Sequence, residues 1–148
     1  MDWQQVGLSI FKVALAYVLA LPVGWEREQA EHSVGVRTFP LVAMASCSYV
    51  LLADTGGGAD NAARSRIIQG LTTGIGFIGG GAILRMRSGN VRGTATAASI
   101  WNTGVIGAAV AESRFEIAVL LSVLNLITLR LLLPLKGKLD HRPRRTDR

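Results

Sequence analysis

Five largely apolar stretches, separated by short charged or glycine-rich segments, dominate the pattern of residues along this chain. At a rise of about 1.5 Å per residue, helices of these lengths approach the roughly 30 Å hydrocarbon core of a bilayer. The stretches cover about Val6–Trp25, Thr38–Ala53, Ile67–Leu84, Gly93–Ala111 and Phe115–Leu135. The pattern predicts an all-α fold, a polytopic membrane helical bundle of about five transmembrane helices.

The distribution of Lys and Arg predicts how this bundle is oriented. With five spans, 11 of the 16 basic residues lie on the side of the C-terminal tail and three lie on the opposite side. Because positive loops stay in the cytoplasm, the N-terminus is predicted outside and the C-terminus inside. Lys12 and Arg130 fall within spans, near enough to an end for their side chains to reach the membrane surface.

Composition supports a membrane domain over residues 1–135, followed by a basic, disordered tail over residues 136–148. The chain of 148 residues is 49% hydrophobic, with a mean hydropathy of +0.35, which is too apolar for an ordinary soluble domain. Its net charge of +6 lies in loops and tail, which favours the anionic lipid bilayer as partner and not nucleic acid. Cys47 is the single cysteine, and the sequence contains no metal-binding or catalytic motif, so we predict no cofactor and no enzymatic activity.

Glycines are concentrated in the third stretch. Several have the GxxxG spacing that lets transmembrane helices approach closely, so this stretch is predicted to pack against the small residues of the fourth. The predicted helix-packing positions are Gly70, Gly74, Gly76, Gly79, Gly80 and Gly104. Residues 74–79 also read G-x-G-x-x-G, but a nucleotide site requires a preceding strand, and the packing interpretation is favoured.

Charged residues next to the spans form the candidate functional cluster. In the predicted topology, the ends of spans one and three and the starts of spans two and four all meet the cytoplasmic surface. The residues placed there are Glu26, Arg27, Arg37, Thr38, Arg85, Arg92 and Thr94. Opposite charges in a partly desolvated setting favour a shared network, which suits a site for an anion, a metal or a partner protein. The simpler alternative is positive-inside anchoring, with Glu26 as a counter-ion.

Other polar residues allow weaker hypotheses. Asp54 and Asp60 have the oxygen ligands that Mg²⁺ prefers, although a solvated loop explains them as well. Polar residues inside the spans suit either a transport path or hydrogen bonds between helices, and the second interpretation is favoured. They are Gln69, Thr72, Thr73, Ser99, Asn102, Thr103, Asn125 and Thr128.

Four segments, in this order, resemble the membrane domain of the MgtC/SapB family of bacterial inner-membrane proteins. They are GWERE at 24–28, GVRTFPLVA at 35–43, RIIQGLTTGIGFIGGGAIL at 66–84 and VRGTATAASIWNTGVIGAA at 91–109. Matching the family motifs directs attention to Glu26, Arg27, Gly35, Arg37, Thr38, Gly74, Gly76, Gly79, Arg92, Gly93, Thr96 and Trp101. Many members carry a further soluble domain, whereas this sequence ends shortly after the fifth predicted span.

The resemblance implies a function in adaptation to low magnesium. We therefore expect a multi-pass protein of the bacterial inner membrane that acts as a non-enzymatic regulator or accessory factor linked to magnesium or ion homeostasis. Its expected partner is another membrane protein or a second copy of itself. The alternative is a small oligomeric transporter or channel for Mg²⁺ or another solute.

Overall fold

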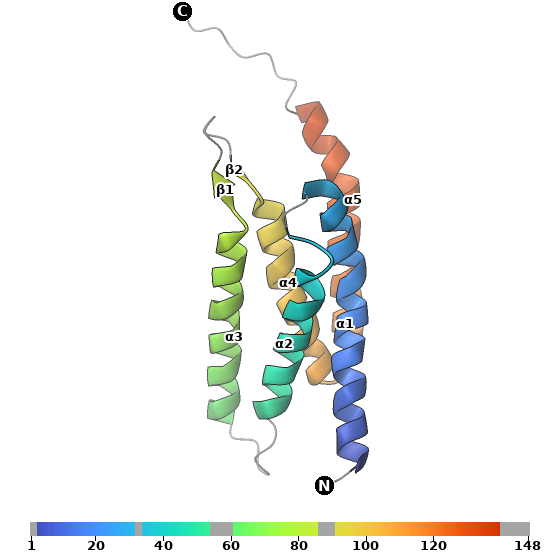
Figure 1. Cartoon of the computed structure of the whole chain (residues 1–148), viewed down its shortest axis with the longest axis vertical. Coiled ribbons are helices and arrows are strands. Elements are labelled where there is room, and N and C mark those ends of the chain that lie inside the picture. The colour runs from blue at the N-terminus through green and yellow to red at the C-terminus, as the bar shows by residue number, and fades with distance from the viewer. Residues whose placement is uncertain (1–2, 32–33, 54–60, 86–90, 140–148) are drawn as a thin grey trace, which may run out of the picture.

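The computed structural model describes residues 3–31, 34–53, 61–85 and 91–139 of the chain. These residues form five α-helices: α1 (Trp3–Glu31), α2 (Thr38–Ala53), α3 (Asn61–Gly81), α4 (Thr94–Ala111) and α5 (Phe115–Leu139). Consecutive helices run in opposite directions, so α1 and α5 point the same way (Figure 1). The prediction of an all-α fold with five helices is confirmed.

The bounds of three helices differ from those predicted by more than a residue or two. α1 continues to Glu31, so residues 26–31 of the charged segment expected between the first two stretches are helical. α3 begins at Asn61, within the segment expected to be a loop, because its first turns consist largely of good helix formers such as Ala and Arg. It ends at Gly81, before the predicted Leu84. α5 extends to Leu139, so residues 136–139 of the predicted disordered tail are helical, and residues 140–148 lie outside the described residues.

A two-stranded ladder connects α3 and α4. Leu84–Arg85 (β1) pairs antiparallel with Val91–Arg92 (β2), with Leu84 opposite Arg92. Gly93 then caps α4 with a φ of 87°. Residues other than glycine rarely adopt this left-handed backbone conformation. A Cβ atom at this position would also overlap the carbonyl oxygen of Ala82, so both the turn and the close approach require glycine.

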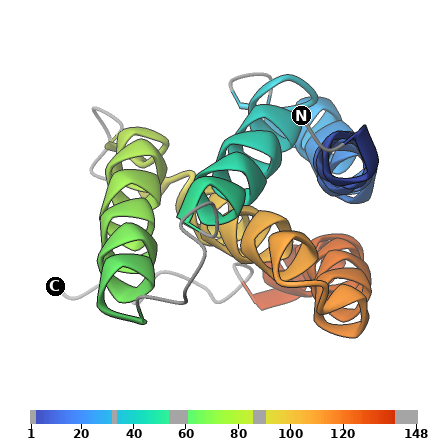
Figure 2. The same cartoon turned by 90° about the horizontal axis from the view of Figure 1, so that it is seen from below.

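α4 is the central helix of the bundle. It contacts each of the other four helices and lies between them when the molecule is viewed along its long axis (Figure 2). Its neighbours come close because its surface is built from small residues. A side chain at Gly104 would overlap Ile75 of α3, and one at Gly107 would overlap the backbone of Ala43 in α2. α3 lies at the edge, against α2 and α4 (Figure 2).

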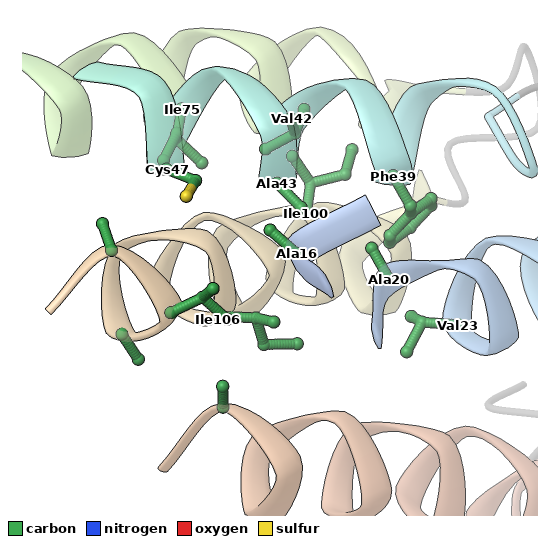
Figure 3. Close-up of a cluster of buried hydrophobic side chains, with 14 of the residues drawn as sticks. Ala16, Ala20, Val23, Phe39, Val42, Ala43, Cys47, Ile75, Ile100 and Ile106 are labelled. Carbon is green, nitrogen blue, oxygen red and sulfur yellow. The ribbon is translucent and has the colours of Figure 1, made fainter. Parts of the chain in front are cut away.

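The exterior of the bundle is apolar as well as its core. The core is a cluster of mostly small apolar side chains contributed by all five helices, including Ala16, Ala43 and Ile100 (Figure 3). Larger apolar side chains lie outside, among them Phe77, which is 85% exposed. α1 is long and apolar enough over Trp3–Gln29 to cross a membrane, and α2 is apolar but shorter. An apolar exterior of this extent indicates contact with lipid or protein partners.

Candidate functional site

The predicted functional cluster is gathered toward one end of the bundle. The ends of α1 and α3, the starts of α2 and α4 and the β1–β2 ladder lie toward this end, which we call the hairpin end (Figure 1). Arg37, Arg92 and Thr94 are exposed there, and the side chain of Arg85 lies outside the description. Among the described residues, no ion pair joins two members of the predicted set. A charge network shared within the set is therefore not observed in that part of the chain.

Glu26 pairs instead with a residue that was not included in the predicted cluster. Its Oε2 atom lies 2.7 Å from Nε of Arg130, on α5. The Glu26 side chain is 15% exposed and the Arg130 side chain is 59% exposed, so this pair lies at the rim of the bundle. No local signal in the sequence marks it, because the two residues are 104 positions apart and only the packing of α1 against α5 joins them.

Glu28 connects the end of α1 to the segment just before α2 through a hydrogen bond. Its Oε2 atom accepts a hydrogen bond of 3.1 Å from the backbone N–H of Val36. A Cβ atom at Gly35 would overlap the Glu28 side chain, so the glycine allows this contact. Glu28 belongs to the GWERE segment, and the sequence alone indicates no role for it.

Arg27 is the most unusual member of the predicted cluster. It continues the buried stripe of α1 formed by Ala16, Ala20 and Val23, and is only 1% exposed. Its Nε and Nη2 atoms have no hydrogen-bond partner among the described residues. A buried charge without partners is strongly unfavourable, and such a group in a folded protein calls for a specific explanation.

An apolar cavity of about 630 Å³ lies between parts of α2 and α3. Thr38, from the predicted cluster, lies at its wall, and Ser46 contributes a buried hydroxyl without a hydrogen-bond partner in the described chain. The full lining comprises Thr38, Leu41, Val42, Ala45, Ser46, Tyr49, Ile67, Gly70, Leu71, Gly74, Ile75 and Ile78. We call this space the α2–α3 cavity.

The six predicted helix-packing glycines divide into two groups. Gly79 lies against Ala97, and Gly104 lies against Ile75, so both are at the contact between α3 and α4. A Cβ atom at Gly70, Gly74, Gly76 or Gly80 would meet no atom within 4 Å, so these four do not contact α4 as we predicted. The reason is geometric. At 3.6 residues per turn, Gly74 and Gly76 point about 200° apart, and the face of α3 that meets α4 carries Ile75 and Gly79.

The G-x-G-x-x-G pattern lies entirely inside α3, between Asn61 and Gly81. It therefore lacks the strand and the turn that place a phosphate at a helix N-terminus in nucleotide sites. The interpretation of these glycines as part of a helix surface is the one that agrees with the fold.

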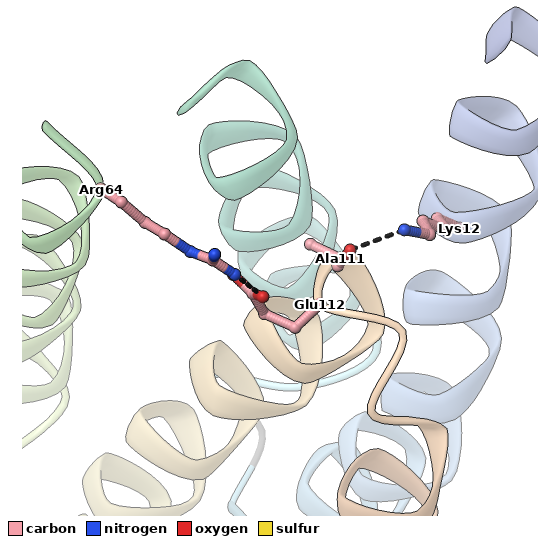
Figure 4. Close-up of polar contacts among 4 residues, drawn as sticks. All are labelled: Lys12, Arg64, Ala111 and Glu112. Carbon is pink, nitrogen blue, oxygen red and sulfur yellow. Dashed lines mark hydrogen bonds and ion pairs between the residues drawn. The ribbon is translucent and has the colours of Figure 1, made fainter. Parts of the chain in front are cut away.

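Two basic residues meet the C-terminal end of α4, at the opposite end of the bundle (Figure 4). Nζ of Lys12 donates a hydrogen bond of 2.7 Å to the carbonyl oxygen of Ala111, and Arg64 forms an ion pair with Glu112. Cations at a helix C-terminus are favoured by the helix dipole. Lys12 is 8% exposed, so its side chain is held against the protein at this end of the bundle.

Polar residues within the helices bond to neighbouring elements. Ser99 Oγ donates a hydrogen bond of 3.0 Å to Asn125 Oδ1, linking α4 to α5. Ser122 Oγ donates one of 2.7 Å to the carbonyl oxygen of Leu19, linking α5 to α1. The prediction of interhelical hydrogen bonds is confirmed for Ser99 and Asn125. It is wrong for Thr72, Thr73 and Thr103, whose hydroxyls donate to carbonyl oxygens of their own helices.

Metal ligands are not gathered in the described part of the chain. Those residues contain no group of three or more His, Cys, Asp or Glu side chains able to hold an ion. Asp54 and Asp60, the predicted candidates for Mg²⁺, lie outside the described residues.

Comparison with known proteins agrees with the order of motifs and with the helical fold. A family model described as the MgtC family matches residues 13–138, which is most of the chain. The chain belongs to the MgtC family. No solved structure matches this MgtC-family chain.

Three relatives illustrate the range of similarity. The protein SrpB of Synechococcus elongatus is 36% identical over 140 residues, covering 86% of this chain and 75% of its own length. YhiD of Escherichia coli K12, which is named as a putative magnesium transporter, is 33% identical over 129 residues, covering 81% of this chain. MgtC of Brucella abortus is 29% identical over 140 residues, covering 95% of this chain. The chain spans 58% of the length of YhiD and of this MgtC.

Proposed function

We propose that this chain is a multi-pass protein of the bacterial inner membrane and a non-enzymatic regulator or accessory factor in magnesium or ion homeostasis. It acts by contacting another membrane protein. The link to magnesium is supported by membership of the MgtC family and by the name of its relative YhiD. The observation that carries the proposal is the open, apolar face of α3 beside the α2–α3 cavity.

The apolar exterior supports insertion in the membrane. Large side chains such as Leu41, Phe77 and Leu131 point outward, whereas Ser99, Thr103 and Asn125 are buried. In water this arrangement would expose apolar surface, but in lipid it satisfies both kinds of side chain. Helices that alternate in direction also suit five passes, with the N-terminus outside and the basic hairpin end in the cytoplasm (Figure 1).

The glycines of α3 suit contact with a partner helix. Gly70 and Gly74 are one turn apart, face the α2–α3 cavity and have no atom of this chain within 4 Å of a Cβ position. Small residues at this spacing allow two transmembrane helices to approach closely. We infer that a transmembrane helix of another membrane protein packs against α3 here, next to the exposed side chain of Ile78.

Transport of Mg²⁺ or another solute by an oligomer is the alternative, and the name of YhiD favours it. A path for Mg²⁺ requires oxygen ligands, because the ion gives up its water reluctantly. The walls of the α2–α3 cavity are mostly apolar, with hydroxyls from Thr38, Ser46 and Tyr49. This lining suits a helix or an acyl chain better than a hydrated cation.

Cross-linking in native membranes tests the proposal. A photo-reactive amino acid at Ile78, which lines the α2–α3 cavity and is 45% exposed, is expected to capture a different membrane protein. The same amino acid at Leu124 on α5, 49% exposed, is the matched control and is expected not to capture that protein. Purified protein in liposomes containing a Mg²⁺ indicator is expected to show no flux. Recovery of this chain alone from position 78, together with flux, would favour the transporter.

A further inference from the structure

The buried guanidinium of Arg27 has no counter-charge among the described residues. The residue is 1% exposed, and Nε and Nη2 have no hydrogen-bond partner in the described part of the chain. Arginine stays protonated in proteins, so burial cannot be relieved by loss of a proton. These two atoms are the donors along one edge of the guanidinium plane, the edge that takes two oxygens of a phosphate or carboxylate side by side.

The carboxylates next to Arg27 in the sequence are engaged elsewhere. Glu26 pairs with Arg130 at 2.7 Å, and Glu28 accepts the N–H of Val36 at 3.1 Å. Neither contact uses the unpaired edge of Arg27. Among the side chains that the structure describes, no carboxylate pairs with Arg27.

A second unpaired donor belongs to Asn125 of α5. Its Oδ1 atom accepts the hydroxyl of Ser99 at 3.0 Å, whereas its Nδ2 atom is buried without a partner in the described chain. Asn125 is 5% exposed. Helices α1, α4 and α5 contact one another pairwise, and the bond to Ser99 directs Asn125 at α4.

Two contacts between α1 and α5 fix the level of Asn125 relative to Arg27. Ser122 bonds to Leu19, 103 positions earlier, and Arg130 bonds to Glu26, 104 positions earlier. The same offset places Asn125 beside residues 21–22, about 8 Å before Arg27 along the axis. Helical side chains lean toward the N-terminus of their helix, so the long side chain of Arg27 brings its guanidinium back toward the level of Asn125.

We propose that Arg27 and Asn125 bind a phosphate-type oxyanion in the seam between α1, α4 and α5. The guanidinium edge holds two oxygens, and the Asn125 amide donates to another. A tetrahedral oxyanion has enough acceptors for donors that arrive from two helices. Both a lipid headgroup and free phosphate have this chemistry. The site is separate from the α2–α3 cavity and does not depend on the proposed partner.

Thermal unfolding of the full chain in a non-ionic detergent tests this site. The melting temperature is measured in inorganic phosphate, in dihexanoyl phosphatidic acid, and in dihexanoylglycerol as the matched lipid without phosphate, all at equal ionic strength. A ligand that binds the folded state raises the melting temperature in a saturable manner. A response to phosphate identifies free anion as sufficient, and a response to phosphatidic acid alone identifies a lipid headgroup.

Substitution of Arg27 shows whether the response belongs to this site. Arg27→Gln is expected to weaken the apparent affinity by about tenfold or more, since charged hydrogen bonds are lost. Arg114→Gln, at the opposite end of the bundle and with a side chain 61% exposed, is the matched control and is expected to respond like the wild type.

Asn125→Asp keeps the test decisive if Arg27→Gln fails to fold. The aspartate retains an acceptor for Ser99 and supplies the missing negative charge from within the chain. This variant is expected to melt at a higher temperature than the wild type without anion and to lose the response to added anion. The proposal is overturned if the wild type responds to no oxyanion, or if Asn125→Asp and Arg27→Gln respond as the wild type does.

Discussion

Single residues fix α4 between its neighbours. Gly93 starts the helix in a left-handed conformation, and Lys12 bonds to its last carbonyl group from the other end. Lys12 is buried, and a Cβ atom at Gly93 would overlap Ala82, so few other residue types fit at these two positions. Substitutions there are expected to act on the stability of the whole bundle.

Gly93→Ala is expected to destabilise the folded protein by about 1–3 kcal/mol, the usual cost of an unfavourable backbone conformation. The overlap of the new Cβ with Ala82 adds to this cost. Gly76→Ala is the control, because open space surrounds that position and alanine favours the helix by roughly 1 kcal/mol. Thermal unfolding in detergent measures both; equal melting temperatures for the two variants would contradict the assigned geometry.

Lys12→Met is expected to lower stability by about 1–3 kcal/mol, because it leaves the buried carbonyl group of Ala111 without its charged donor. Arg114→Gln, which breaks only an exposed pair with Glu116, is expected to change stability by less than about 1 kcal/mol. The same unfolding measurement compares them. If Lys12 served only as a surface anchor, methionine would be tolerated at least as well as glutamine at position 114.

At the scale of elements, the small-residue surface of α4 determines how closely α2 and α3 approach. Gly107 faces the backbone of Ala43, which cannot move aside as a flexible side chain does. Gly80, on α3, faces open space. A glycine in a helix therefore contributes to packing only where a neighbouring helix meets it, as at Gly107 but not at Gly80.

Gly107→Leu is expected to separate α2 from α4 and to cost at least about 1–3 kcal/mol, as overpacked cores do. Gly80→Leu is expected to leave the fold of a single chain intact. Protease resistance of the purified variants distinguishes the outcomes. Loss of folding in Gly80→Leu, with Gly107→Leu unaffected, would show that the packing faces are assigned incorrectly.

At the scale of the whole molecule, the alternating helices predict which connections share a side of the membrane. Reporter fusions at Gly58 and Ser88 are expected to lie on opposite sides, with Ser88 in the cytoplasm, because α3 separates the two positions. Reporters of periplasmic and cytoplasmic location measure this directly. The same location for both fusions would rule out a membrane-spanning α3.

The sequence predicted the elements well where one segment was sufficient to specify them. The second predicted span has the bounds of α2, Thr38–Ala53, because a charge at one end and polar residues at the other confine the apolar run. α3 was misjudged at both ends because its polar first turns are helical and a strand follows its last turn. The helix propensity of a local segment does not include the contacts with other elements that decide where a helix such as α3 begins and ends.

By itself, the sequence determined the five helices, their apolar surfaces and the family, since hydropathy and motif order are properties of the chain. Only the tertiary structure decided which side chains meet. It joined Glu26 to Arg130, directed Ile75 and Gly79 at α4, and left two buried nitrogens of Arg27 without a partner among the described residues. The physical reason is that contacts between helices depend on their rotation and relative height, and the pattern within one helix specifies neither of these.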